Sequence, residues 1–263
     1  MYLPDYITEI KTYLMENNVP PQPEAAVILG SGLGGFTDLI SDKVILPYKS
    51  IPGFPSTTVA GHSGELISGT VEGHSVIAFS GRFHHYEGYS FQKTVVPVHI
   101  SKALKTGKLI ISNAAGAVNT MFRVGDLMVI DSIIRQNYLR APLTYTPYRY
   151  NLEESAYEVR NLATEIGITL QQGTYLFTKG PNYETKAEIQ AFRTMGTDVV
   201  GMSTVAELSE ASRLQIKTAA ISLITNMAAG IAPGKLDHSE VKKAADAKKD
   251  EFGRLVAWLI KKL

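Results

Sequence analysis

The chain alternates between short apolar runs and longer segments in which apolar residues recur at helical spacing. Ile7, Ile10 and Leu14 predict a helix that ends near Asn18, before the helix-breaking "PPQP". "AAVILG" (25–30) is a continuous apolar run, which is typical of a strand buried on both faces. "ELISGTV" and "SVIAFSG" flank the turn "EGH" and predict a β-hairpin.

The alternation continues to the C-terminus. Asn151 and Glu154 are spaced as in a capping box, and an apolar stripe opposed by lysines predicts a long helix from Asp237 to the end. The pattern predicts helices over 91–106, 151–167, 185–196 and 203–215, and strands at "KLIISNAAG", "GDLMVIDSII", "GTYLFTKG", "DVVGM" and "TAAISLITN". We therefore expect an α/β fold with a central mixed β-sheet flanked by helices, in a single domain spanning residues 1–263.

Composition narrows the classes of partner. Hydrophobic residues make up 44% of the 263 residues, enough for a sizeable core, and 26 basic against 25 acidic residues give a net charge of +1. Because the chain carries no large excess of positive charge, nucleic acid and anionic membranes are disfavoured as partners. The absence of cysteine excludes disulfides and thiolate metal sites. Neither a signal-peptide pattern nor an apolar run of about 20 residues occurs, so we expect a cytoplasmic protein.

"GSGLGG" follows the first predicted strand. Gly30, Gly32 and Gly35 fit the dinucleotide-binding fingerprint, but the acidic residue expected about 20 positions later is missing, because 50–58 contains no acid. A nicotinamide-dependent dehydrogenase is thereby disfavoured. Backbone N–H groups and the Ser31 hydroxyl still suit an anion, although a plain glycine turn explains the segment equally well.

"SGRFHHYEGY" (80–89) gathers ionisable and planar groups at the end of another predicted strand. Arg82 can bind a phosphate through its bidentate fork, and His84 can donate beside it. Tyr86 offers a flat face and a hydroxyl, which suit a sugar. His62, in "AGHSGE", is a further donor, although a lone histidine is more often structural.

Other predicted strands also end in residues suited to a ligand. Ala114 lies in a stretch of small residues, Tyr183 and Glu184 follow a Gly-Pro turn, and Ser203 and Asn226 follow two further strands. Each has an ordinary structural explanation, such as close packing or helix capping. Together, however, they follow the carboxyl ends of strands, where α/β sheets bind ligands. We therefore predict one composite pocket.

Seven segments, taken in their order along roughly residues 28–240, resemble the signature series of the trimeric purine nucleoside phosphorylases. They are "GSGLG", "AGHSGE", "GRFHHYEGY", "SNAAGAV", "GPNYET", "VGMSTVAE" and "SLITN". The resemblance implies an α/β fold, a homotrimer, and no metal or organic cofactor. It also implies a pentosyltransferase of purine salvage. Its reversible reaction converts a purine nucleoside and phosphate into free base and ribose 1-phosphate.

The resemblance also assigns roles. The implied phosphate-binding residues are Ser31, His62, Arg82, His84, Ala114 and Ser203. The implied ribose-binding residues are Tyr86, Met202 and His238. The implied purine-binding residues are Tyr183, Glu184, Val200, Gly201 and Asn226, of which Glu184 and Asn226 are catalytic together with His84. Asn226 would donate to purine N7 and Glu184 would accept from N1–H, which favours inosine and guanosine over adenosine.

The sequence departs from the family in one loop. Where many relatives carry a Phe-Gly-x-Arg-Phe-Pro element whose first aromatic reaches the neighbouring subunit's ribose, this chain has "RQNYLRAPLTYTPYRY". Tyr145, Tyr148 and Tyr150 are candidate replacements, and the sequence does not choose among them. Ala206 stands where a proline is usual.

Two alternatives remain open besides the dehydrogenase. A methylthioadenosine phosphorylase typically has aspartate in place of Asn226 and an apolar residue in place of His238, so both residues favour a 6-oxopurine enzyme. A catalytically silent purine-binding protein would keep the same pocket and lack phosphate-dependent turnover.

Overall fold

The computed structural model describes residues 3–58, 62–135, 149–232 and 238–263, and it omits the side chains of 149–151 and 238–240. The helices are α1 (Tyr6–Glu16), α2 (Phe91–Thr94), α3 (Val96–Ala103), α4 (Glu153–Glu165), α5 (Lys186–Thr194), α6 (Val205–Arg213) and α7 (His238–Lys262), with 3-10 segments η1 (Leu33–Leu39), η2 (Tyr48–Ser50) and η3 (His85–Glu87). The strands are β1 (Ala25–Leu29), β2 (Ser41–Pro47), β3 (Glu65–Val71), β4 (His74–Ser80), β5 (Lys108–Ala117), β6 (Leu127–Arg135), β7 (Arg149–Asn151), β8 (Gln171–Phe177), β9 (Val199–Gly201) and β10 (Lys217–Met227).

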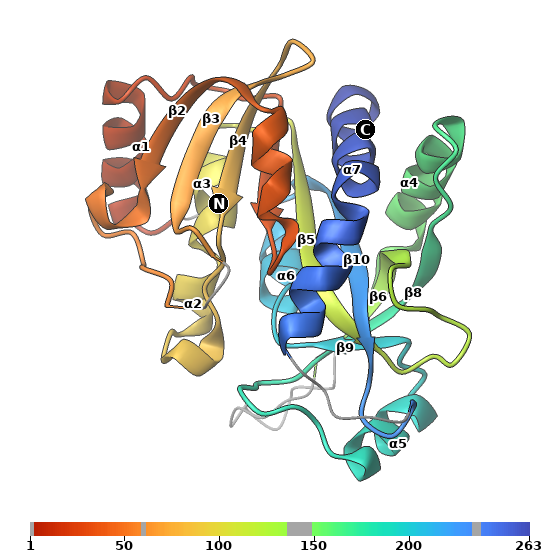
Figure 1. Ribbon diagram of the computed structural model, residues 1–263. Helices are drawn as coiled ribbons and strands as arrows, with labels where there is room; N and C mark the ends of the chain where they lie inside the picture. The colour runs from red at the N-terminus through yellow and green to blue at the C-terminus, as the bar shows by residue number, and fades with distance from the viewer. Residues whose placement is uncertain (1–2, 59–61, 136–148, 233–237) are drawn as a thin grey trace.

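The strands form one mixed sheet in the order β10-β6-β8-β9-β5-β1-β4-β3-β2, with β7 beside β6. Figure 1 shows β2, β3 and β4 toward one end of the sheet and β6 and β8 toward the other. β1, β4, β5 and β10 run parallel to one another, whereas β9 is antiparallel to β5. β10 also pairs with β5, so β10, β6, β8, β9 and β5 close into a ring. This closure brings the ends of strands that are distant in the sequence close together in space.

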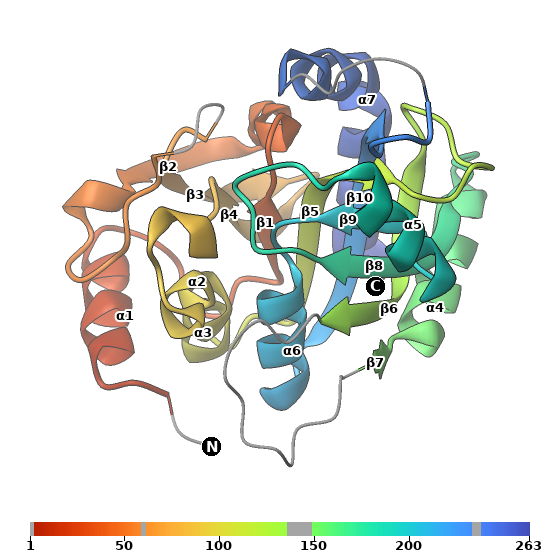
Figure 2. The same ribbon diagram turned by 90° about the horizontal axis from the view of Figure 1, so that it is seen from below.

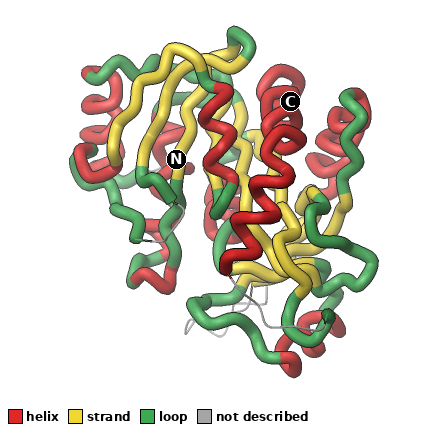
Figure 3. The backbone as a smooth tube through the Cα atoms, in the orientation of Figure 1, coloured by secondary structure: helices red, strands yellow, loops and turns green. Residues whose placement is uncertain are grey.

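Apolar side chains on the two faces of the sheet form separate cores. Helices α1, α3 and α6 cover one face, and α4 and α7 cover the other. Figure 2 shows α7 on the opposite side of the strands from α1, α3 and α6, and Figure 3 shows helices on both sides of the sheet. In the described part of the chain, no helix is long and apolar enough to cross a membrane.

The predicted fold class is confirmed, and the differences are local. The helix expected over 91–106 is divided into α2 and α3, because Pro97 lacks an N–H and favours the first turn of a new helix. The capping box predicted at Asn151 is wrong: Leu152 is the N-cap of α4 and makes no side-chain cap bond. Strand β2 was not predicted, because its mostly exposed residues lack a clear apolar alternation.

Candidate active site

A cavity of about 360 Å³ lies where the ends of β1, β4, β8 and β9 meet the last residues of β5 and β10. Twelve of the residues assigned by resemblance line it: Ser31, Arg82, His84, Tyr86, Ala114, Tyr183, Glu184, Val200, Gly201, Met202, Ser203 and Asn226. Its wall is completed by Ala115 and Gly116, from the same stretch of small residues as Ala114, and by four residues that were not predicted from the sequence: Pro181, Thr225, Ala228 and Val241. The predicted composite pocket therefore exists.

Two candidate residues, His62 and His238, are not among the residues that line the cavity. His62 lies behind Ser31 rather than on the cavity wall. His238 is the first residue of α7, and its side chain lies outside the described part of the structure. Tyr145 and Tyr148 also lie outside the described residues, and of Tyr150 only the backbone in β7 is described.

The expectation that every candidate follows a strand end is wrong for two residues. Ala114 lies within β5 and Asn226 within β10. Gly116 of β5 pairs with Val200 on one side and with Asn226 on the other, next to an irregularity in β10. The ring closure of the sheet thus brings residues from within β5, β9 and β10 to the cavity, which no local pattern reveals.

Two glycines of "GSGLGG" are required by close packing. A Cβ on Gly30 would lie 2.7 Å from the Cα of Asn113 and 3.1 Å from Nη1 of Arg82. Gly32 has φ +78°, and a Cβ there would lie 2.6 Å from the Cβ of Ala245 in α7. The segment therefore packs closely against β5 on one side and α7 on the other, and Ser31 lines the cavity.

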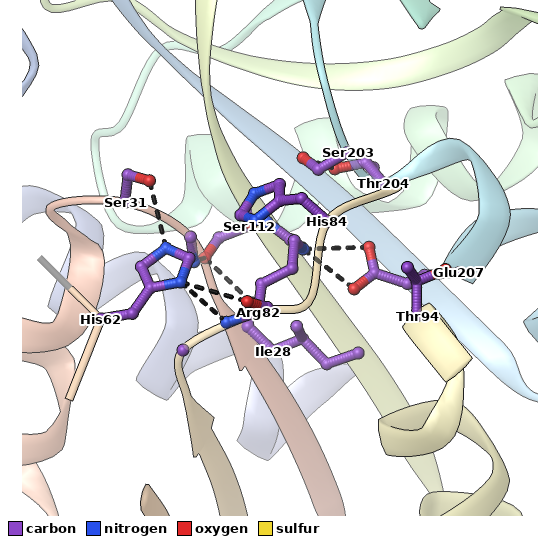
Figure 4. Close-up of polar contacts among 12 residues, drawn as sticks. Ile28, Ser31, His62, Arg82, His84, Thr94, Ser112, Ser203, Thr204 and Glu207 are labelled. Atoms are coloured by element: carbon purple, nitrogen blue, oxygen red, sulfur yellow. Dashed lines mark hydrogen bonds and ion pairs between the residues drawn. The ribbon is translucent and has the colours of Figure 1, made fainter. Parts of the chain in front are cut away.

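Arg82 is held rigidly beside the cavity (Figure 4). Its side chain is 2% exposed, and its Nε donates to both carboxylate oxygens of Glu207, at 2.9 and 3.1 Å. Its Nη1 donates to the carbonyl oxygen of Ser112 at 2.7 Å, while Nη2 is buried without a hydrogen-bond partner among the described residues. An unmatched buried donor on a fixed guanidinium suits an anionic ligand.

The Ser31 hydroxyl is oriented by His62, as Figure 4 shows. The backbone N–H of Arg82 donates to Nδ1 of His62 at 3.0 Å, so Nδ1 is the unprotonated nitrogen of the neutral ring. Nε2 then carries the proton and donates to the Ser31 Oγ, 3.1 Å away. Because Oγ accepts this bond, the hydroxyl hydrogen of Ser31 remains available to a ligand.

His84 is buried between cationic and aromatic neighbours. Burial, together with the charge of Arg82 and the nearby His62, lowers the pKa of His84 to about 4. Its Nδ1 lies 3.0 Å from Oε1 of Glu87, so in the neutral ring Nδ1–H donates to that carboxylate. In that tautomer Nε2 is an acceptor, which suits the O–H of a protonated phosphate.

Tyr86 lines the cavity next to His84. Its ring stacks on His84 with centroids 4.7 Å apart. Burial raises the pKa of the Tyr86 hydroxyl to about 12, so it stays a neutral donor. A Cβ on Gly180 would lie 2.9 Å from the Tyr86 ring and would clash with the sulfur of Met202, so these two side chains converge on one point.

The backbone is strained at Thr204, the residue that follows Ser203. Thr204 has φ +71° and ψ −44°, and the N–H of Val205 donates to the carbonyl oxygen of Ser203 at 2.7 Å. This is a γ-turn, which is costly for a β-branched residue. The turn begins α6, and the Ser203 hydroxyl lies 3.0 Å from that of Thr204, at the same side of the cavity as Arg82 (Figure 4).

Two threonine hydroxyls contact a carboxylate and an amide that line the cavity. Thr178 Oγ1 donates to Oε1 of Glu184 at 2.6 Å. Thr225 Oγ1 donates to Oδ1 of Asn226 at 3.0 Å, which fixes the amide so that Nδ2 is the remaining donor. A Cβ on Gly116 would lie 3.0 Å from that Nδ2, so glycine keeps the amide accessible.

The comparisons agree with this geometry. A family model described as the phosphorylase superfamily matches residues 24–261. Purine nucleoside phosphorylase 1 of Bacillus subtilis is 43% identical over 258 residues, covering 94% of each chain, and the mouse purine nucleoside phosphorylase is 36% identical over 98% of this chain and 95% of its own. The crystal structure of a schistosome purine nucleoside phosphorylase with hypoxanthine has a TM-score of 0.86 at 33% identity and covers 98% and 97% of the two chains.

The chain belongs to the purine nucleoside phosphorylases of the phosphorylase superfamily. As a member of this family it is a pentosyltransferase. A second solved relative, from Schistosoma mansoni and bound to adenosine, has the same TM-score of 0.86 at 34% identity. The methylthioadenosine phosphorylase alternative is not favoured, because all of these relatives are named purine nucleoside phosphorylases.

Besides Thr225, three polar residues that contact the site were not predicted, although the sequence carries signals for two of them. Glu207 is a lone acid between apolar residues in "VGMSTVAEL", a pattern that indicates a buried, paired carboxylate. Glu87 lies within the same ten-residue stretch as Arg82 and His84. Nothing in the sequence distinguishes Thr178 from other threonines at strand ends.

Proposed function

We propose that this chain catalyses the reversible phosphorolysis of 6-oxopurine nucleosides, releasing the free base and (deoxy)ribose 1-phosphate, in one catalytic domain spanning residues 1–263. The observation that carries the proposal is a single cavity lined by two chemically different sets of groups. A buried arginine with an unmatched N–H lines it together with a carboxylate and an amide. These two sets suit an anionic nucleophile and a heterocyclic base.

At the anionic end, phosphate is bound by Arg82, Ser31, Ser203 and the backbone around Ala114, with His84 accepting a phosphate O–H. His62 orients the Ser31 hydroxyl rather than facing the ligand. Fixed donors in a desolvated site hold the nucleophile without reorganisation during the reaction. In this proposal phosphate is a co-substrate, and no metal or organic cofactor takes part.

At the base end, Asn226 Nδ2 donates to purine N7 and Glu184 accepts from N1–H. Breaking the glycosidic bond moves negative charge into the purine, so both hydrogen bonds strengthen in the transition state. Val200, Gly201 and Tyr183 line the purine slot. A 6-oxopurine carries hydrogen on N1, whereas adenine does not, so inosine and guanosine are the preferred substrates.

Between the two ends, Tyr86, Met202 and His238 contact the ribose. The proposed assembly is a homotrimer that acts in cytoplasmic purine salvage. The family relationship supports the assembly. Gel filtration with light scattering measures it, and a monomer would contradict it.

The test of the activity is inosine incubated with and without phosphate. We expect hypoxanthine to appear only with phosphate, in equal amount to ribose 1-phosphate. Stabilisation by hypoxanthine without turnover would instead indicate a silent purine-binding protein. Faster turnover of methylthioadenosine than of inosine would overturn the substrate class.

A further inference from the structure

Thr178 lies one residue beyond β8, outside the cavity lining. Its side chain is buried, with 6% of the residue exposed. Its backbone N–H donates to the carbonyl oxygen of Gly201 at 2.9 Å, which joins the ends of β8 and β9. Thr178 is therefore attached to the sheet rather than to the loop that follows it.

Unlike Thr178, Glu184 does not lie next to a strand in the sequence. It lies in the segment between β8 and α5, is half-buried, and lines the cavity. A glutamate has three side-chain torsions, and a half-exposed carboxylate has many orientations of similar energy. A carboxylate that recognises one edge of a base needs one orientation only, because a shift of about 1 Å weakens the hydrogen bond it makes in the transition state.

The hydroxyl of Thr178 supplies that restraint. Oγ1 lies 2.6 Å from Oε1 of Glu184, and an ionised carboxylate only accepts, so the hydroxyl is the donor. A hydrogen bond to a charged group is among the stronger kinds in proteins. It engages Oε1 from the sheet side and leaves Oε2 as the acceptor for a ligand.

We propose that Thr178 is a positioning residue for purine discrimination: by fixing Glu184 from the sheet, it sets the preference of the enzyme for bases that carry hydrogen on N1. The inference rests on the proposed function, because it assigns to Glu184 the N1–H of a 6-oxopurine. A ligand without N1–H gains nothing from a fixed acceptor. Loss of the Thr178 hydroxyl therefore weakens recognition of inosine and leaves adenosine unaffected.

The experiment compares Thr178→Val, which keeps the shape and removes the donor, with Thr178→Ser, which keeps the donor. Thr197→Val is the matched control, because Thr197 is also buried, lies outside the cavity lining and has no hydrogen-bond partner for its hydroxyl among the described residues. Steady-state kcat/KM is measured for inosine and adenosine at saturating phosphate. KM for phosphate is measured at saturating inosine.

For Thr178→Val we expect kcat/KM for inosine to fall about tenfold, the size typical of a lost hydrogen bond to a charged group. Neither kcat/KM for adenosine nor KM for phosphate should change. Where adenosine turnover is too slow to measure, inhibition by hypoxanthine and by adenine replaces it, with only hypoxanthine weakened. Thr178→Ser should restore most of the inosine activity, and Thr197→Val should behave like the unmodified enzyme.

An equal loss for inosine and adenosine in Thr178→Val would overturn the inference, since it would indicate a general structural role. No loss for either substrate would also overturn it. If the valine variant does not fold, Thr178→Ala provides the same comparison. The failure of the underlying function is separate: it is shown by unmodified protein that releases no hypoxanthine from inosine and phosphate.

Discussion

The two ends proposed for the cavity, one for phosphate and one for the base, are built in different ways. The phosphate end depends on contacts between residues far apart in the sequence: Arg82 and Glu207 are 125 positions apart, and Ser31 and His62 are 31 apart. At the base end, Thr178 and Glu184 are six positions apart. Arg82 and Glu207 at the phosphate end are each 2% exposed, whereas Tyr183 at the base end is 43% exposed.

This difference has a physical reason. A small, strongly hydrated anion binds only where fixed donors replace its water, and such donors have to be held by the packed interior. A purine is large and planar and has to enter and leave, so its polar contacts lie on a more open segment. Substitutions at the phosphate end should therefore affect both stability and activity, whereas those at the base end should affect mainly activity.

The largest expected effect is at the ion pair. Glu207→Gln leaves the guanidinium of Arg82 buried without its counter-charge and should lower the free energy of unfolding by about 3–5 kcal/mol. Phosphate should stabilise this variant more than the unmodified enzyme, since the anion supplies the missing negative charge. Urea denaturation with and without phosphate measures both effects. Unchanged stability would show that the pair does not hold the phosphate end together.

The base end should respond in the opposite way. Asn226→Ala removes a fixed donor to N7 and should lower kcat for inosine by about 10²–10³. Its melting temperature should stay close to that of the unmodified enzyme, because the amide makes mainly local contacts. Near-full activity would refute the assignment of Asn226, and a large loss of stability would refute the contrast between the two ends.

His84, at the proposed phosphate end, contributes to the pH dependence of stability. The pKa of His84 is lowered to about 4 in the folded protein, against 6.5 for the ordinary group, so the unfolded chain takes up a proton first. Stability should therefore fall as the pH drops from 6.5 to 4, by on the order of 3 kcal/mol, since one pKa unit corresponds to about 1.4 kcal/mol. His84→Gln should flatten this slope, as measured by urea denaturation at several pH values. An unchanged slope would contradict the neutral, buried imidazole.

The smallest effect is expected at Ser31. Ser31→Ala removes one hydroxyl donor to phosphate and should raise KM for phosphate by about tenfold or less. KM for inosine should remain unchanged, because the serine lies at the anionic end. Initial rates at varied phosphate and fixed inosine provide the measurement. A matching rise in KM for inosine would mean that the two ends are not independent.

The sequence predicted much of this molecule because its signals are local. Alternating apolar runs predicted the helices and strands, and hydroxyl, guanidinium, imidazole, carboxylate and amide groups followed strands in an order that resembles a known family. Twelve of the residues assigned by that resemblance line one cavity. Ala114 and Asn226, by contrast, reach the cavity from inside strands, because β5 and β10 pair along the ring closure.

By itself, therefore, the sequence determined which chemical groups are present and which local elements carry them, since apolar periodicity and side-chain type are properties of neighbouring residues. Only the tertiary structure decided their state. It paired Arg82 with Glu207, left Nε2 of His84 as an acceptor, and attached Glu184 to Thr178. Burial, protonation and orientation depend on which distant residues pack together, and they become fixed when the chain folds.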